Sequence, residues 1–320
     1  MKKFFFCAAA AIVALASCSK TEVVNTSAPE EIGFKAVTGA VTKVAGQQSG
    51  TLTGDMGVYA FINGTADTEY FTNIKFTGTD TWTGGQYWPL QSSLNFVIYA
   101  PHDANASYST KKLTVDATNV GIDLIDRQTD YLYGAEYYDG SGNDEGKGYA
   151  TQQTAIATKL NHALAKVTLK FTGANVKVNS VSLEQPYLSG TYTVDYTDTD
   201  SPTIEWKAIQ ESNNLTLSGI RDAVLAPAVL DDPKTLDRDE TADEQTASAS
   251  IMVVPEDDSN IIITYTIAGT DDVLTATVKL DGTWAAGKHY TYNIKIQPNE
   301  IKFTPSVNDW TTANDVNTTL

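Results

Sequence analysis

Apolar and polar residues alternate along much of the chain with a period of two. The alternation is clearest in residues 166–171, 274–280 and 290–296, where every second residue is apolar. Because successive side chains of a strand point to opposite faces of its sheet, this period predicts strands with one buried face. The apolar residues of 176–183 change phase at Asn179, which predicts a strand that is bent there.

Other segments are apolar almost without interruption, and turn-forming residues end them. Residues 58–62 are followed by Asn63-Gly64, and residues 94–100 are followed by Pro101. Asn-Gly favours a tight turn, and proline interrupts a sheet because it lacks the amide hydrogen. Short apolar runs bounded in this way predict buried strands.

Helical periodicity is scarce, and the best helix-forming stretch, residues 154–165, gives way to strand-like alternation. Many short strands separated by Gly, Asn and Asp turns are typical of β-sandwiches. The most loop-like stretch in the middle of the chain is residues 139–148, and we place a domain boundary shortly after it. The sequence therefore predicts an all-β protein with β-sandwich domains at residues 32–155 and 156–320.

The N-terminus has the features of a bacterial lipoprotein signal peptide. Two lysines precede an apolar run over residues 4–16, which is too short to span a bilayer as a helix. Residues 15–18 (LASC) fit the lipobox that lipoprotein signal peptidase recognises. We therefore expect residues 1–17 to be removed and Cys18 to be lipidated. The polar stretch at residues 18–31 predicts a tether between the lipid and the fold.

The chain is strongly acidic, with 22 Lys and Arg residues against 39 Asp and Glu residues and a net charge of −17. This balance argues against nucleic acid as a partner, because phosphates are bound by basic surfaces. Acidic clusters at 195–200, 231–244 and 256–258 lack the EF-hand spacing and are interpreted as solvated loops. Cys7 leaves with the signal peptide and Cys18 takes the lipid, so we expect no disulfide.

No familiar catalytic or cofactor-binding motif is present. His102, His162 and His289 are scattered, and isolated histidines are more often structural than metal ligands. The sequence has no nucleophile elbow, P-loop or dinucleotide fingerprint. Two carboxylates brought together by the fold remain an open alternative, but we expect no enzyme activity, no metal and no cofactor.

An aromatic cluster gives an alternative function. Five aromatic residues lie close together in the sequence: Tyr70, Phe71, Trp82, Tyr87 and Trp88. Such residues either stack on sugar rings or fill a sandwich core. The core is favoured, because Trp88 leads directly into the apolar run at 94–100. The alternative is a surface lipoprotein that binds a glycan or another ligand through Trp82 and Trp88.

Nine short segments form an ordered set along nearly the whole chain: 32–34 (IGF), 42–44 (TKV), 70–73 (YFTN), 87–89 (YWP), 96–101 (FVIYAP), 130–135 (DYLYGA), 160–167 (LNHALAKV), 286–292 (AGKHYTY) and 307–310 (VNDW). Together with the lipobox, this set resembles the fimbrillin family of type V pilins and their Mfa-like relatives. Leu160 stands where phenylalanine is usual in that family.

The resemblance implies two transthyretin-like β-sandwich domains in tandem. It also implies a structural or accessory subunit of a type V pilus that supports cell adhesion, with stalk, tip and anchor positions all left open. In that family a lipoprotein precursor reaches the surface of the outer membrane, and a trypsin-like protease cuts behind the first strand. A strand from another pilin subunit then fills the groove by donor-strand exchange. Because this head-to-tail contact does not close on itself, it builds a fibre.

Lys43 is the candidate cleavage site. No arginine precedes Arg127, so a trypsin-like protease acting near the N-terminus must cut after Lys20, Lys35 or Lys43. Lys20 lies in the tether and Lys35 lies inside the expected first strand at residues 32–37, whereas Lys43 precedes a loop rich in Gly and Gln. The resembled family carries a basic residue there, more often arginine. The alternative is that Lys43 is an ordinary loop residue and that the subunit stays held by its lipid.

Overall fold

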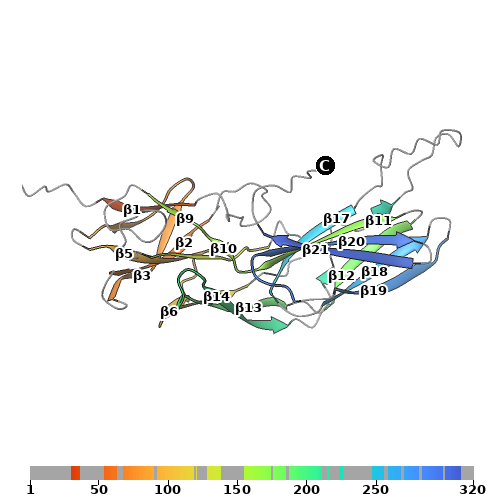
Figure 1. Cartoon of the computed structure of the whole chain (residues 1–320). Helices are drawn as coiled ribbons and strands as arrows, with labels where there is room; N and C mark the ends of the chain where they lie inside the picture. Colours follow the sequence, from red (N-terminus) through yellow and green to blue (C-terminus); the bar gives the residue numbers. More distant parts are fainter. Residues whose placement is uncertain are drawn as a thin grey trace, which may run out of the picture.

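The computed structural model describes residues 30–36, 54–62, 68–89, 92–118, 120, 128–137, 155–173, 176–184, 187–210, 215–216, 223–225, 247–255, 259–267, 270–280, 283–297 and 300–310. This part of the chain consists of strands, turns and irregular segments and contains no helix, so the predicted all-β class is confirmed. The strands form four sheets along an elongated molecule (Figure 1). No helix that could cross a membrane occurs in these ranges.

The first sheet has eight strands and is rolled so that its two ends approach each other. Its strands, in spatial order, are β10 (Asn161–His162), β8 (Leu132–Glu136), β5 (Leu94–Ala100), β2 (Met56–Ile62), β3 (Thr68–Gly78), β4 (Trp82–Tyr87), β1 (Glu31–Ala36) and β9 (Ile156–Thr158). β9 and β10 lie at opposite ends of this order, although only Lys159 and Leu160 separate them in the chain. The link between them therefore draws the ends of the sheet together.

The interior of the rolled sheet is the first core. Its members are Ile32, Phe34, Met56, Val58, Ala60, Phe71, Phe76, Trp82, Trp88, Leu94, Phe96, Ile98, Ala100, Leu132, Ile156 and Leu160. The intervening residues of β2 and β5, among them Tyr59 and Val97, face a second layer on the other side. Strands that are covered on both faces read as continuous apolar runs, which is why the sequence predicted both as buried strands.

The second layer is a four-stranded sheet that joins segments from both sides of residue 155. Its order is β14 (Thr203–Gln210), β13 (Tyr187–Asp195), β7 (Lys112–Ala117) and β6 (Ser107–Ser109). β13 pairs with β7 over Gly190–Asp195, so the β13–β14 hairpin lies in one sheet with β6 and β7 (Figure 1). β9 and β10 also follow residue 155 yet belong to the first sheet. The division into two domains at that residue stays a prediction, and strand pairing crosses it.

The remaining two sheets face each other as a sandwich. One contains β17 (Ala247–Val253), β11 (Ala165–Gly173), β20 (Lys288–Gln297) and β21 (Glu300–Asp309); the other contains β15 (Leu215–Thr216), β12 (Val176–Leu183), β18 (Ser259–Ile267) and β19 (Val273–Leu280), with β16 (Ala223–Leu225) beside β12. Val167, Leu169 and Phe171 of β11 lie in the core between them, as predicted. The register of β12 shifts between Val178 and Ser180, which confirms the predicted bend.

A middle core joins this sandwich to the first sheet. It combines residues of both halves of the chain: Tyr59, Phe61, Val97, Tyr99, Ala106, Leu113, Val115, Ala117, Val120, Tyr131, Tyr133, Ala163, Leu164, Tyr192, Val194, Tyr196, Met252, Val254 and Trp310. The buried Gln128 side chain accepts a hydrogen bond from the Met252 amide (2.6 Å) and donates one to its carbonyl (2.8 Å). The two halves therefore share one continuous interior.

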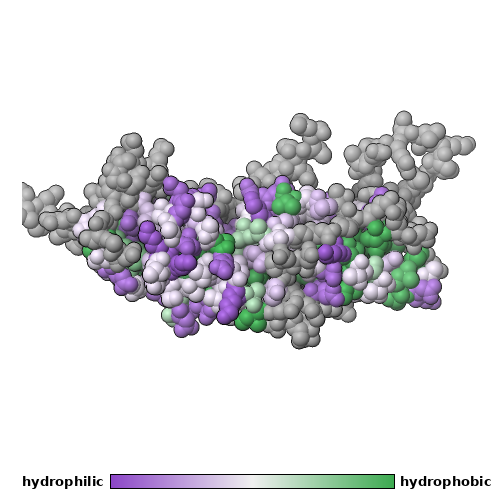
Figure 2. Space-filling view, turned by 60° about the horizontal axis from the view of Figure 1, so that its bottom comes forward, coloured by the Kyte–Doolittle hydropathy of each residue, from purple (hydrophilic) through white to green (hydrophobic). Residues whose placement is uncertain are grey.

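Edge strands carry the exposed large aliphatic side chains. Ile209, Val273 and Val307 lie on β14, β19 and β21, and each of these strands ends a sheet. Figure 2 shows apolar residues gathered at the end of the molecule formed by the sandwich of the β17-β11-β20-β21 and β15-β12-β18-β19 sheets. Edge strands present unpaired backbone groups, to which another strand can add.

Candidate functional site: the slot of the first strand

β1 lies between two partners, antiparallel to β4 and parallel to β9. Phe34 is paired on both sides, with Trp82 in β4 and Ile156 in β9. We call this place between β4 and β9 the β1 slot. The strand begins at Glu31, one residue earlier than the sequence predicted. β9 ends the sheet, so among the described strands β1 is its only ladder partner.

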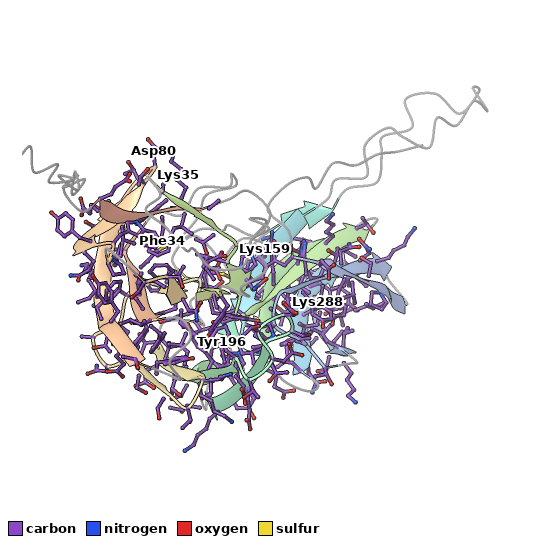
Figure 3. All side chains as sticks on the ribbon, turned by 60° about the vertical axis from the view of Figure 1, so that its left-hand side comes forward. Phe34, Lys35, Asp80, Lys159, Tyr196 and Lys288 are labelled. Carbon is purple, nitrogen blue, oxygen red and sulfur yellow. The ribbon has the colours of Figure 1, made fainter. Side chains whose placement is uncertain are left out.

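Two side chains of β1 enter the first core. Ile32 and Phe34 are both 0% exposed, which fits their two-residue spacing on the strand. The Phe34 ring makes edge contacts with Phe76 (centroids 5.3 Å apart, 70° between planes) and Phe96 (5.2 Å, 86°). Figure 3 shows Phe34 within the rolled first sheet and Lys35 at its periphery. Edge-to-face aromatic pairs stabilise beyond simple burial, so Phe34 anchors the strand.

Backbone contacts fix the start of β1. The Trp88 amide donates to the Glu30 carbonyl (3.0 Å), and the Gly85 amide donates to Glu31 Oε1 (2.9 Å). The β1–β4 register shifts after Glu31, opposite Gly85, which has a φ of +67°. Glycine adopts this left-handed conformation without strain. β4 can therefore bulge and still hold the beginning of β1.

One buried acid lies on β8, against the residues that directly follow the β9 wall of the slot. Leu132 and Glu136 lie on the same face of β8, and Glu136 is only 5% exposed. Burial raises the pKa of Glu136 from 4.5 to about 7, while the Lys159 backbone amide acts in the opposite direction. Sequence analysis missed this residue. The available signal was that Glu136 shares a strand face with the apolar Leu132, where a buried side chain is expected.

The slot is built to bind an extended segment without covalent chemistry. β4 and β9 offer backbone hydrogen bonds on both sides, and the first core accepts two apolar side chains. Removing β1 exposes that apolar surface and leaves the backbone groups of both neighbours unpaired, a state that favours another strand. The described residues hold no cluster of three or more possible metal ligands.

The predicted lipidation and cleavage sites, Cys18 and Lys43, lie outside the described residues. Lys35 lies within the described part. Its side chain is exposed, but its backbone is paired opposite Ala157 in the ladder between β1 and β9. This agrees with the expectation that pairing shields Lys35 from a protease.

The tryptophans of the predicted aromatic cluster are core residues. Trp82 is 1% exposed and Trp88 is 2% exposed, and Trp82 Nε1 donates to the Gly54 carbonyl (2.8 Å). This confirms the core interpretation, because buried rings cannot stack on a sugar. Tyr70 and Tyr87 remain exposed, and the Tyr70 hydroxyl donates to the Tyr87 carbonyl (2.8 Å).

A buried junction, which sequence analysis did not assemble, joins distant members of the ordered set. His162 Nδ1 lies 3.0 Å from Asp130 Oδ2, and its ring stacks on Trp310 with centroids 3.6 Å apart and an interplanar angle of 5°. The Trp310 amide donates to the Gly287 carbonyl, and the Gly287 amide donates to the Leu164 carbonyl (both 2.8 Å). His162 is therefore structural, as expected, and it ties β10 to the end of β21.

Comparisons with known proteins agree with this fold. Among curated proteins, none matches the sequence. A candidate cell adhesion protein from Bacteroides uniformis has a similar structure, with a TM-score of 0.53 and 18% identity over 88% of this chain and 99% of that one. Another from Bacteroides ovatus has a TM-score of 0.53 and 15% identity over 90% and 100%. Identities this low show a shared fold alone. The sequence model of the fimbrillin-like family matches residues 42–310, most of the chain, and the protein therefore belongs to that family.

Proposed function

We propose that the chain is a structural or accessory subunit of a type V pilus, which supports cell adhesion and assembles by strand exchange at the β1 slot. The single observation that carries this proposal is the place of β1, the first described strand, deep in a core whose other walls come from later residues. Membership of the fimbrillin-like family supports it.

Export and anchoring follow from the N-terminal sequence. In this proposal residues 1–17 are removed and lipid on Cys18 holds the precursor on the outer membrane, with the fold exposed at the cell surface as part of the fimbrium. Each buried methylene of an acyl chain contributes about 0.8 kcal/mol, so several chains anchor a protein firmly. The acidic chain needs this lipid, because its charge disfavours binding to anionic headgroups.

Maturation is proposed to separate β1 from the strands that hold it. Lys43 lies between the end of β1 at Ala36 and the start of β2 at Met56. A trypsin-like protease that cuts after Lys43 leaves β1 bound by non-covalent contacts alone. β1 can then be lost together with the lipid-bearing tether, and its slot becomes free.

Another pilin subunit supplies the new strand, and β21 of a second copy has a suitable sequence. It begins Glu300-Ile301-Lys302-Phe303, which differs from residues 31–34 (EIGF) at one position. Among the described strands, β21 ends its sheet and pairs only with β20, so it can leave without dividing that sheet. Ile301 and Phe303 have the two-residue spacing that both apolar positions of the slot require.

Electron microscopy of the protease-treated protein tests this proposal. We expect rods after cleavage of the purified chain and a new N-terminus at Val44 by mass spectrometry. Lys43→Gln should leave a monomer, whereas the matched control Lys20→Gln, which alters only the tether, should still assemble. Normal rods from Lys43→Gln, or assembled fibres whose subunits begin at Cys18, contradict the proposed maturation.

A further inference from the structure

We propose that Glu136 couples occupancy of the β1 slot to a proton: its carboxyl keeps the proton while a strand fills the slot and releases it to solvent when the slot empties. This inference rests on the proposed role of the slot in strand exchange. It adds a regulator, the pH at the cell surface, which favours the filled slot when acidic and the open slot when alkaline.

The first step of the coupling leads from β1 to β9. β9 has three residues, and the ladder that holds it in the sheet is its parallel pairing with β1, from Phe34 opposite Ile156 to Ala36 opposite Thr158. A three-residue edge strand with one partner has little stability of its own. When β1 leaves, the segment around Thr158 therefore loses its ladder and, within the described residues, is held only from its other end, by Leu160 and β10.

The second step leads from β9 to Glu136. Glu136 lies on the same face of β8 as Gly134, and Gly134 packs against Lys159 and Leu160, so the segment that follows β9 also covers this acid. Packing there is close: a Cβ added to Gly134 would lie 2.6 Å from the Lys159 carbonyl oxygen and 2.9 Å from Leu160 Cδ2. Little space is left between β8 and residues 159–160, which keeps water from the carboxyl.

The described charged groups near Glu136 do not stabilise its ionised carboxylate in place of water. Lys35 on β1 and Lys159 after β9 have exposed side chains, and Tyr133 on β8 belongs to the opposite, middle core. On the neighbouring edge, Asp130 is paired with His162. None of these side chains is among the groups that shift the pKa of Glu136, and burial is the largest cause.

The direction of the effect follows from the pKa in the two states. In the filled slot the pKa of Glu136 is about 7, and in water the ordinary value is 4.5. Between these values the filled state binds more protons than the open state, so its stability falls as the pH rises. The coupling is reciprocal: ionising Glu136 promotes loss of the strand, and seating a strand draws a proton from solvent.

Hydrogen exchange of the β1 amides in the full chain, corrected for the pH dependence of unstructured amides, measures slot opening directly. From pH 5.5 to pH 8 we expect the opening equilibrium to rise about 25-fold, as the pKa values of 7 and 4.5 require. In Glu136→Gln the rise should disappear. Glu205→Gln, the same change at an exposed position of β14, should retain the full rise.

An unchanged pH dependence in Glu136→Gln overturns the coupling. If that variant fails to fold, the carboxyl is titrated in the wild-type chain by ¹³C NMR, and a midpoint near 4.5 equally overturns it. Both measurements use the monomer, so they are separate from assembly. A chain that opens with rising pH but never forms rods removes the pilus proposal and leaves this coupling intact.

Discussion

Aromatic contacts between single residues determine how firmly β1 is held. Phe34 is fully buried and meets Phe76 and Phe96 edge-on, while Trp88 also contacts Phe96 (centroids 5.8 Å apart, 86° between planes). Such packing has the density of a protein interior, where a lost ring leaves a cavity that neighbours fill only in part. The anchor of the strand is therefore also a main support of the first core.

Phe34→Ala tests that support. Truncating a buried phenylalanine removes transfer free energy and leaves a cavity, so we expect the free energy of unfolding to fall by about 3–5 kcal/mol in a urea titration. Lys35→Ala, on the exposed side of the same strand, should change it by less than about 0.5 kcal/mol. Equal losses in the two variants would show that strand pairing, and not the buried ring, holds β1.

For single residues, the sequence predicts which side chains share a strand face better than it predicts which residues contact each other. Ile32 and Phe34 could be placed in the core from their spacing alone, because a strand has only two faces. The contact of Asp130 with His162 could not be predicted, since no local rule brings residues this far apart in sequence together. Glu136 was hidden for a different reason: an acid is usually exposed, and only its neighbours show otherwise.

Among the elements, the β13–β14 hairpin has the largest effect on the architecture. It follows the predicted boundary at residue 155, yet it extends the sheet of β6 and β7 and covers the middle core. Tyr192 of β13 is fully buried there, with Trp206 of β14 beside it (centroids 5.2 Å apart). Burial raises the pKa of Tyr192 well above its ordinary value, so its side chain stays neutral.

Tyr192→Ala should loosen a strand that lies far away in the sequence. We expect a loss of about 3–5 kcal/mol in stability, as for other large buried rings, and faster hydrogen exchange in β7, which pairs with β13. The Tyr192 hydroxyl is buried without a hydrogen-bond partner in the described part of the chain. Tyr192→Phe is therefore the matched control and should be neutral or stabilising. Unchanged exchange in β7 of the alanine variant contradicts the pairing.

Individual strands could be read from the sequence, but their pairing could not. The apolar runs at 58–62 and 94–100 and the alternation at 166–171 all became strands. Pairing is made by backbone groups that all residues except proline share, so the sequence of β7 does not indicate β13 as its partner. Strands that follow each other in the chain usually pair or lie side by side. The β13–β14 hairpin departs from this rule, because it joins the sheet of β6 and β7, which lie much earlier in the chain.

For the whole molecule, three cores follow one another. The middle core takes residues from β2, β7, β13 and β17, so strands of both halves of the chain build it. The fold class could be predicted because period-two patterns and turns dominate the chain. How the two halves share an interior depends on three-dimensional contacts that the sequence pattern does not contain.

Cys18→Ala tests the anchoring of the molecule independently of its fold. In cells we expect this variant to lose palmitate labelling and delivery to the outer membrane, because the acceptor thiol of the lipobox is gone. Hydrogen exchange of the described strands should be unchanged, since Cys18 precedes the first of them. Cys7→Ala, within the signal peptide, should be labelled normally. Normal labelling of Cys18→Ala would refute the lipoprotein assignment.

The late position of the β13–β14 hairpin in the chain determines the order of folding events during synthesis. β2 and β5 emerge early, and β6 and β7 soon supply part of the layer over the face that includes Tyr59 and Val97, but that layer is complete only when residues 187–210 follow. Contacts between distant segments form slowly, and apolar surface exposed in the meantime promotes aggregation. A growing chain must therefore be protected until more than half of it has been made, and a chain that stops before the hairpin carries an aromatic face that β6 and β7 cover only in part.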